Sequence, residues 1–411
     1  MLNEVSPESE INNLIQEYGK ISFAKFMELA LFSPNGGYYT SSPEDRHNAD
    51  YYTAPLAHPA FGALIAIQLE QMWETLGCPA QFYVVEMGSG QGALARDILD
   101  YSNQLNMEFA VAIRYISIDY TLPLHPSANI QTILAKTLPF RNVVGCVLSN
   151  ELIDAMPVHR FIIHNNRLQE IFVGLKMGFY EEIFAEPSCP ALVSRISNLK
   201  CDLPDGFRGE VNLAAMEWVR NVANMLYKGF VITVDYGHQE EDLYSSQRSG
   251  GTLRCYYDHM LSDNPYKRIG RQDITSHVDF TLLRQTGEVA GLETLGLIEQ
   301  GAFLNNLGFR KLWDNLSEQD LTQHQLDSNR MGMLELVKPD GFGNFKVHIQ
   351  SKNLPNNFSL VGLSPKQREP QLEPNLVNTP LISKRHVNIM LGRYPHLSWD
   401  WNNSWSDEYP S

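Results

Sequence analysis

The sequence predicts an α/β fold with a mostly parallel sheet, an N-terminal helical cap and an inserted antiparallel β meander. Three observations support this prediction. An apolar strand runs into a glycine-rich turn and an amphipathic helix between Tyr83 and Leu99. Strands and helices alternate from about residue 81 to residue 150, which is typical of parallel sheets with crossover helices. Short apolar runs separated by turn residues then follow between Val158 and Ala185.

The N-terminal region, from about residue 11 to residue 76, is predicted to be helical and to cover the sheet. Its segment Ile21–Leu31 has an apolar helical face, and Ser22 is placed to cap it. An aromatic loop follows, with Tyr38 and Tyr39 in its first part and Asp50-Tyr51-Tyr52-Thr53 in its second. These tyrosines are interpreted as the edge of a core, with a lid over a ligand as the alternative.

The glycine-rich turn is the most informative motif. Gly88, Gly90 and Gly92 directly follow the strand Tyr83–Glu86. Glycine tolerates positive φ and lets a ligand approach the backbone, and the helix that follows presents free amide groups at its start. The motif therefore predicts a nucleotide-type cofactor site, with a merely flexible turn as the alternative.

Two cofactor classes use such a turn. The spacing fits a dinucleotide fingerprint, in which the start of the helix holds a pyrophosphate. Glu86, however, would repel a pyrophosphate at the mouth of the loop, whereas it suits the ammonium group of S-adenosylmethionine. Asp119 closes the next apolar strand, where it can bind ribose hydroxyls in either class or remain a solvated strand end. The polarity of Glu86 favours S-adenosylmethionine.

The later part of the chain adds two strands that end in polar residues. Val143–Leu148 leads into Asn150 and Glu151, and Phe230–Val234 leads into Asp235. A helix is predicted over residues 210–227, helices over 282–337 and a strand over 345–349. The predicted segments are a cap (1–80), a first part of the cofactor-binding core (81–157), the meander (158–209), the rest of the core with the substrate side (210–352), and a Pro- and Asn-rich, extended tail (353–411). Trp399, Trp401 and Trp405 of that tail can dock on a surface.

Because ligands of open parallel sheets bind beyond the carboxyl ends of the strands, the polar residues after these strands are candidate site residues. Glu151 and Asp154 can clamp a guanidinium group, and Asn150 suits an amide or small-molecule acceptor. The alternative is that Asn150 caps a helix and Asp154 is a solvated acid of its first turn. His277 can orient a substrate or accept a proton, although a lone histidine is more often structural. Arg254 is predicted to form an internal salt bridge rather than to bind a carboxylate.

Composition limits the function classes. The chain has 32 basic and 47 acidic residues and a net charge of −15, which argues against binding to a nucleic acid backbone and accommodates a basic partner. Five cysteines without a CxxC pair indicate neither a disulfide framework nor a zinc site, and no metal is predicted. The N-terminal residues lack a secretory signal and no run is long enough to span a membrane, so a cytoplasmic location is predicted.

With these motifs assembled, the chain resembles the MidA (DUF185) family of class I S-adenosylmethionine-dependent methyltransferases over roughly residues 11–350. The motifs that carry the resemblance are Phe26–Leu31 with Gly37-Tyr38-Tyr39, Asp50–Thr53, Glu86–Gly92, Asn150–Val158, Asp235-Tyr236-Gly237, Gly251–Arg254 and Gln272–Phe280. The resemblance implies a Rossmann-like core with a seven-stranded sheet, and methylation of arginine in a protein. Mitochondrial members are associated with methylation of a core subunit of respiratory complex I and with assembly of that complex. The chain departs from the family pattern at Ala54-Pro55-Leu56 and at Tyr120-Thr121-Leu122, which bears on the substrate side.

The resulting prediction is a methyltransferase whose partner is a protein substrate, such as a subunit of a complex I-like enzyme. The predicted cofactor residues are Glu86, Gly88, Gly90, Gly92, Asp119 and Asn150, and the predicted catalytic residues are Glu151, Asp154 and His277. Two alternatives stay open at this point: a dinucleotide-dependent oxidoreductase, and a noncatalytic assembly protein that retains the fold.

Overall fold

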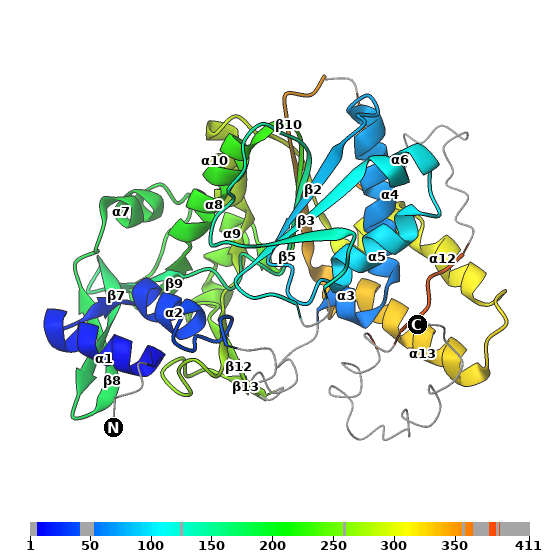
Figure 1. The fold of residues 1–411 in the computed structure, drawn as a ribbon. Coiled ribbons are helices and arrows are strands. Elements are labelled where there is room, and N and C mark those ends of the chain that lie inside the picture. Colours follow the sequence, from blue (N-terminus) through cyan, green and yellow to red (C-terminus); the bar gives the residue numbers. More distant parts are fainter. Residues whose placement is uncertain are drawn as a thin grey trace. The chain divides into compact units, whose positions relative to one another are not determined.

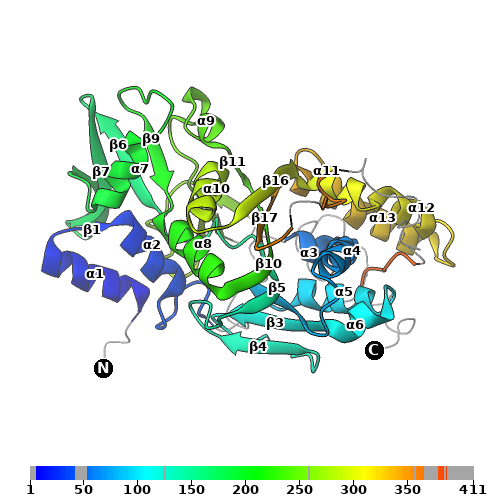
Figure 2. The ribbon, with the colours of Figure 1, turned by 90° about the horizontal axis from the view of Figure 1, so that it is seen from above.

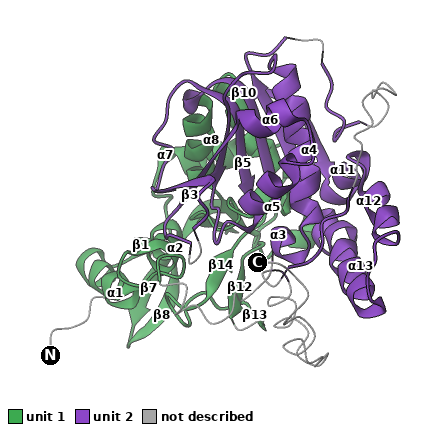
Figure 3. Cartoon of the chain, turned by 45° about the vertical axis from the view of Figure 1, so that its right-hand side comes forward, with its two compact units in different colours: residues 1–50, 151–223, 235–291 green, residues 51–150, 224–234, 292–411 purple. Residues whose placement is uncertain are grey.

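The structure is a computed structural model of the chain. It describes residues 6–41, 53–123, 126–257, 260–355, 358–364, 378–383 and 386. The predictions for Asp50-Tyr51-Tyr52 and for Trp399, Trp401 and Trp405 lie outside these residues. The chain forms two compact units that are interleaved along the sequence (Figure 3). Unit 1 comprises residues 1–50, 151–223 and 235–291, and unit 2 comprises residues 51–150, 224–234 and 292–411.

Unit 2 is built on a seven-stranded sheet with the order β16-β17-β10-β5-β2-β3-β4. Its strands are β2 (Phe82–Met87), β3 (Ile113–Asp119), β4 (Ile130–Leu134), β5 (Val143–Asn150), β10 (Leu226–Asp235), β16 (Glu293–Glu299) and β17 (Lys346–Lys352). The pairs β10·β5, β5·β2, β2·β3 and β3·β4 are parallel, and β16·β17 is antiparallel. Figure 1 shows β2, β3 and β5 side by side. The predicted α/β fold and its seven-stranded sheet are confirmed.

Two glycines fix the spacing at the centre of this sheet. Gly145 of β5 lies beside Tyr83 of β2 and Gly229 of β10 in the strand register. A Cβ atom at Gly145 would lie 2.0 Å from the backbone oxygen of Tyr83, and one at Gly229 would lie 1.9 Å from that of Gly145. Since both contacts are with backbone atoms, no side chain can move aside to relieve them. These two positions therefore require glycine.

Helices of unit 2 pack on the sheet and enclose the largest core. They are α3 (Ala54–Ala57), α4 (Ala60–Thr75), α5 (Ala93–Ser102), α6 (Met107–Ala112), α11 (Gln300–Asn306), α12 (Phe309–Leu316), α13 (Gln323–Val337) and the 3₁₀ turn η2 (Phe342–Asn344). α4 is buried along most of its length, because apolar residues cover nearly all of its circumference. Gly62 of α4 faces Asp97 of α5, where a Cβ atom would lie 2.5 Å from the Asp97 Cβ. Figure 2 shows α4 and α5 close together beside the strands.

Two segments of the predicted tail belong to this core. Leu360 and Val361 are buried in it, and the amide of Gly362 donates to Gln68 of α4 over 3.1 Å. Further along, His386 is buried and its Nε2 lies 3.1 Å from the Asp97 carboxylate. These contacts anchor segments that the sequence analysis describes as an extended appendage, since Pro- and Asn-rich composition gives no periodic signal for such docking.

Unit 1 contains the first two helices and the central part of the chain. Its helices are α1 (Pro7–Tyr18), α2 (Phe23–Phe32), α7 (Pro190–Ser197), α9 (Glu240–Leu243), α10 (Phe280–Val289) and the 3₁₀ turn η1 (Ser246–Arg248), and α8 (Leu213–Met225) begins in this unit. The predicted cap Ser22 is confirmed, because its hydroxyl accepts from the amide of Lys25 over 3.2 Å. α1 and α2 pack with Val173 and Ile274 in a second core.

The predicted β meander is confirmed in unit 1. β6 (His159–His164), β7 (Arg167–Lys176) and β8 (Phe179–Ala185) pair antiparallel in sequence, and β1 (Ile21–Ser22) and β9 (Arg208–Val211) complete a five-stranded sheet. The predicted turns contain positive φ angles at Asn165, Asn166, Met177 and Gly178. Two smaller sheets join β11 (Gly237–His238) to β15 (Val278–Asp279), and β13 (Met260–Ser262) to β12 (Arg254–Tyr257) and β14 (Asp273–Thr275).

The compact units are interleaved along the sequence, whereas the five predicted segments are consecutive. The division into these five segments stays a prediction. Within the described ranges, no helix combines the length and the apolar character that crossing a bilayer requires. The same ranges contain no group of three histidine, cysteine or acidic residues arranged to hold a metal ion.

Candidate functional site

In unit 2, the predicted glycine turn links β2 to α5. Gly88, Gly90 and Gly92 have φ angles of 78°, 52° and 72°, so each adopts the left-handed conformation for which glycine is favoured. The Gly88 amide donates to the carbonyl of Ile118 over 2.9 Å, and the Gly90 amide donates to the Asp119 carboxylate over 2.8 Å. The structure therefore brings together the glycines and the acid that closes the neighbouring strand.

The turn is open where a ligand would approach. A Cβ atom at Gly90 would meet nothing within 4 Å, and no side chain caps the first turn of α5. Arg96 of α5 fixes the loop, since its Nη2 donates to the carbonyl of Gln91 over 2.6 Å. Exposed backbone at the N-terminus of a helix suits a polar or nucleotide-like ligand. The residues present therefore fit the predicted cofactor site.

Glu86 lies beneath this turn. Its side chain is buried, with only 3% exposed, and its carboxylate accepts from the Tyr115 hydroxyl over 3.0 Å. Burial raises the pKa of Glu86 to about 7, and the nearby Asp119 carboxylate adds to this effect, while Tyr115 and Arg96 oppose it. A cation placed beside Glu86 would favour its ionised form. Glu86 thus matches the expected partner of an ammonium group.

Asp119 is half-buried and fixes the backbone of the turn. Besides Gly90, it accepts from the amide of Tyr120, at 2.6 Å from Oδ1. These bonds place the carboxylate at the carboxyl end of β3, beside the glycines. Its predicted role toward ribose hydroxyls stays a prediction.

The structure contradicts the alternative that Asn150 caps a helix and that Asp154 is a solvated acid of its first turn. Asn150 is the last residue of β5, where it pairs in register with Val234, and no helix follows before β6. Asn150 is therefore not a helix cap. Asp154 is not a solvated acid either, because only 2% of it is exposed. The helix was expected because polar residues after a parallel strand commonly start a crossover helix.

In unit 1, the segment after β5 brings carboxylates together. Glu151 has a φ angle of 50°, which is strained for a residue with a side chain and frequent at functional sites. Asp235 is fully buried, and its Oδ2 accepts from the amide of Ile153 over 2.9 Å. Asn212 donates to the carbonyl of Ile153 over 3.0 Å, which further fixes the segment. We call Glu151, Asp154 and Asp235 the acid cluster.

Two carboxylates of the acid cluster, those of Asp154 and Asp235, have raised pKa values. Burial raises the pKa of Asp154 to about 6, and the Tyr236 hydroxyl, which donates to Asp154 Oδ2, counteracts part of this effect. The pKa of Asp235 is raised well above its ordinary value by burial and by the charges of Asp154 and Glu151. A cation that binds next to buried carboxylates stabilises their ionised forms. The acid cluster is therefore suited to bind a positively charged group.

His277 lies next to this cluster. Its ring centre is 5.6 Å from that of Tyr236 and 5.2 Å from that of His238, and the amide of Ser276 donates to the carbonyl of Asp154 over 3.0 Å. Burial, followed by the charge of His238 and of two arginines, lowers the pKa of His277 to about 4. The imidazole is therefore neutral near pH 7. A neutral ring with so low a pKa suits the orientation of a substrate better than the acceptance of a proton from it.

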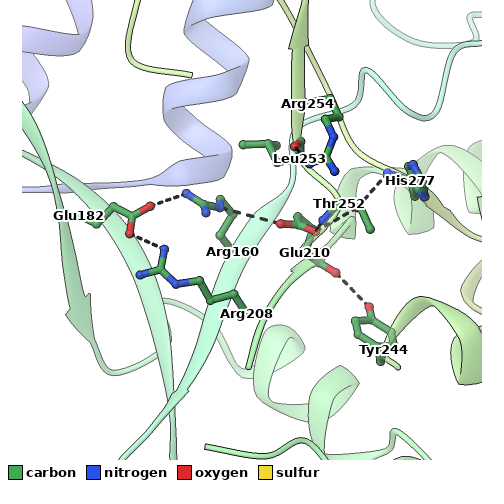
Figure 4. Close-up of polar contacts among 9 residues, drawn as sticks. All are labelled: Arg160, Glu182, Arg208, Glu210, Tyr244, Thr252, Leu253, Arg254 and His277. Atoms are coloured by element: carbon green, nitrogen blue, oxygen red, sulfur yellow. Dashed lines mark hydrogen bonds and ion pairs between the residues drawn. The ribbon is translucent and has the colours of Figure 1, made fainter. Parts of the chain in front are cut away.

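His277 also lines a pocket of about 680 Å³ within unit 1. We call it the arginine pocket. Its lining includes four arginines, Arg160, Arg208, Arg248 and Arg254, and two acids, Glu182 and Asp263. Figure 4 shows the Glu182 carboxylate between the guanidinium groups of Arg160 and Arg208, each at 2.7 Å. The hydroxyl of Thr252 lies 3.0 Å from Glu210, whose carboxylate is 3.9 Å from Arg160.

The internal salt bridge predicted for Arg254 stays a prediction. Its Nη1 donates to the carbonyl of Leu253 over 2.8 Å, and within the described ranges it forms no ion pair. Sequence reasoning placed Asp235 among the candidate segments without giving it a role, and it missed the arginine pocket as a whole. Asp235 carried a signal, because it ends a strongly apolar strand, whereas the pocket joins β6, β9 and the loop before β12, which sequence spacing does not connect.

Comparisons with known proteins agree with these features. A family model described as "Putative S-adenosyl-L-methionine-dependent methyltransferase" matches residues 64–298. The chain is 26% identical over 362 residues to "Protein arginine methyltransferase NDUFAF7 homolog, mitochondrial" of Drosophila melanogaster, covering 79% of this chain and 80% of that protein. It is 25% identical over 391 residues to "Protein arginine methyltransferase NDUFAF7, mitochondrial" of Homo sapiens, covering 86% of this chain and 82% of that protein.

A solved structure gives a similar result. A crystal structure described as a "likely methyl transferase from Burkholderia thailandensis bound to S-adenosyl-homocysteine" matches with a TM-score of 0.76 and 27% identity. The match covers 87% of this chain and 94% of that chain. A native structure from the same organism matches with a TM-score of 0.74 and 26% identity, with the same coverage.

Proposed function

Because this chain belongs to the family of S-adenosylmethionine-dependent methyltransferases whose model matches residues 64–298, we propose that it methylates a guanidinium nitrogen of arginine in a protein. The acid cluster is the observation that carries this proposal. It holds three carboxylates in unit 1, two of them buried, with pKa values raised by burial. The names of the Drosophila and human relatives, which call them protein arginine methyltransferases, support the choice of acceptor.

S-adenosylmethionine is the cofactor of this family, and it supplies a methyl group on a sulfonium when bound. We assign its binding to the glycine turn, with Asp119 fixing the turn, Glu86 facing the ammonium group and Asn150 shaping the edge of the site. The family match favours this cofactor over the dinucleotide that the glycine spacing also allows. In that assignment, Glu86 becomes fully ionised when the ammonium group binds beside it.

The acid cluster would bind and orient the acceptor. A guanidinium group stays protonated in proteins and forms bidentate bonds with carboxylates, so Glu151 and Asp154 can fix its plane. Tyr236 holds Asp154, and the backbone amide of Ile153 holds Asp235. When the acceptor nitrogen gains the methyl carbon, the bond between that carbon and the sulfonium sulfur would break, S-adenosylhomocysteine would be left, and the nitrogen would lose a proton. A carboxylate whose pKa is near 6 can accept that proton and later release it to water.

We further propose that the acceptor is a subunit of a complex I-like respiratory enzyme, as the resemblance to the MidA family implies. The names of the relatives place those proteins in mitochondria. The cytoplasmic location predicted from the sequence stays a prediction for this chain.

The experiment is to incubate the purified chain with methyl-labelled S-adenosylmethionine and the acceptor subunits of such an enzyme. Label is expected in methylarginine after hydrolysis. Glu151→Gln should lower the rate by roughly a hundredfold, because one bidentate partner and its charge are lost, while binding of S-adenosylhomocysteine persists. Glu217→Gln, at an exposed position of α8, is the matched control. Label in a residue other than arginine, or full activity in Glu151→Gln, would contradict the proposal.

A further inference from the structure

Two of the four arginines of the arginine pocket form no ion pair with a carboxylate that the structure describes. Glu182 pairs with Arg160 and Arg208, which accounts for two of the four arginines. Arg248 donates to the carbonyl of Asp242 over 2.8 Å, and Arg254 donates to the carbonyl of Leu253 over 2.8 Å. Within the described ranges, neither of these two arginines forms an ion pair. This arrangement contrasts with the net charge of −15 of the whole chain.

Both of these arginines lie near His277. All three side chains line the same pocket, and the charges of the two arginines contribute to the low pKa of the imidazole. The Nδ1 atom of His277 is buried and has no hydrogen-bond partner within the described ranges. A buried polar atom without a protein partner commonly bonds to a water molecule, an ion or a ligand. Among the described residues, the pocket thus combines two arginines without an ion pair and a neutral imidazole whose Nδ1 has no protein partner.

The charge of the pocket indicates the class of ligand. Two arginines are already paired, and Glu182 and Asp263 also line the pocket, so the field suits a single negative charge better than a doubly charged phosphate. A carboxylate accepts two parallel bonds from one guanidinium group, which favours arginine over lysine at such a site. The volume of about 680 Å³ is large enough for an amino-acid side chain with part of its backbone.

We propose that Arg248 and Arg254 bind the carboxylate of an acidic residue that neighbours the acceptor arginine in the substrate. His277 contributes to both places, because it lines the arginine pocket and its ring contacts that of Tyr236, which holds Asp154 of the acid cluster. A peptide with its arginine at the acid cluster would therefore place an adjoining residue at the arginine pocket. This inference rests on the proposed function and adds a preference for an acidic neighbour.

The first part of the test needs no methyl transfer. N-acetyl-glutamate amide and N-acetyl-glutamine amide are titrated into the full chain, and binding is followed by hydrogen exchange of peptides that span residues 205–211 and 250–257. The variants are Arg248→Gln and Arg254→Gln. Arg220→Gln, at an exposed position outside the pocket, is the matched control. Saturable protection by the glutamate probe, weakened at least tenfold in both pocket variants and unchanged in the control, is the expected result.

The second part uses acceptor peptides that differ only in having Glu or Gln beside the arginine. Arg254→Gln is expected to raise KM about tenfold for the Glu peptide and to leave KM for the Gln peptide unchanged. If the glutamate probe binds but no peptide is methylated, the carboxylate site stands and the proposed function fails. The inference is overturned if both probes bind equally, if inorganic phosphate binds more tightly than the glutamate probe, or if Arg254→Gln affects both peptides alike.

Discussion

Replacing Glu86 by glutamine should make the stability of unit 2 less dependent on pH. In the folded chain the pKa of this carboxyl is raised from 4.5 to about 7, mainly by burial. A raised carboxyl pKa contributes stability that is complete below pH 4.5 and is lost as the pH rises through 7. At 1.36 kcal/mol per pH unit, the whole loss is roughly 3 kcal/mol. Between pH 5 and pH 8.5 it amounts to roughly 2.5 kcal/mol, because part of it has already occurred at pH 5.

Glu86→Gln also weakens the contact with the Tyr115 hydroxyl, but that cost is the same at both pH values and cancels in the comparison. Native-state hydrogen exchange of peptides from β2 and β3 measures the free energy of opening in unit 2 directly. Relative to the wild type, the variant should gain roughly 2.5 kcal/mol on going from pH 5 to pH 8.5. Glu108→Gln, an exposed acid on α6, is the matched control and should show no such gain.

A difference between the variant and the wild type that is equal at the two pH values would refute this reasoning. It would mean that Glu86 ionises as easily in the folded chain as in the unfolded one. The assignment of Glu86 to an ammonium group would then lose its electrostatic basis.

Three further predictions concern single contacts. Tyr236→Phe removes a hydrogen bond that lowers the pKa of Asp154, so the acidic limb of the pH profile of kcat/KM should move to higher pH, as initial rates would show. Unchanged limbs would exclude Asp154 as the titrating group. Gly145→Ala should prevent folding or lower the melting temperature strongly in circular dichroism, since its Cβ would meet the Tyr83 oxygen at 2.0 Å; an unaltered melting curve would contradict this. His386→Ala should destabilise unit 2 by about 1–3 kcal/mol in urea titrations, because it removes the contact of His386 with the buried Asp97. If residues 378–386 can be removed without loss of stability, this segment does not stabilise unit 2.

The sequence predicted the sheet and the glycine turn because their signals are local. An apolar strand, three glycines and an amphipathic helix occupy consecutive positions between Phe82 and Ser102, so each element is indicated by residues that are neighbours in the sequence. The β meander was equally predictable, since its turns lie at Asn165-Asn166 and Met177-Gly178, between runs of strand-forming residues.

The site was less predictable where it depends on contacts between distant segments. The rule for parallel strands predicts that the loop after β5 and the end of β10 lie near each other, but the burial of Asp154 and Asp235 depends on hydrogen bonds that no local pattern indicates. The arginine pocket depends in the same way on Arg160, Arg208 and Arg254, which come from three separate strands. Docking of His386 against Asp97 joins positions 289 residues apart. Such contacts follow from tertiary packing rather than from local pattern.

The most direct test of guanidinium recognition by the acid cluster compares an acceptor peptide with its citrulline counterpart, which has nearly the same shape and no charge. Calorimetry in the presence of S-adenosylhomocysteine, in two buffers of different ionisation enthalpy at pH 6.5, measures both affinity and released protons. Only the arginine peptide should bind tightly, and its binding should release protons, because the cation lowers the raised pKa values of Asp154 and Asp235. Equal affinity for both peptides, or binding of the arginine peptide without proton release, would contradict this prediction.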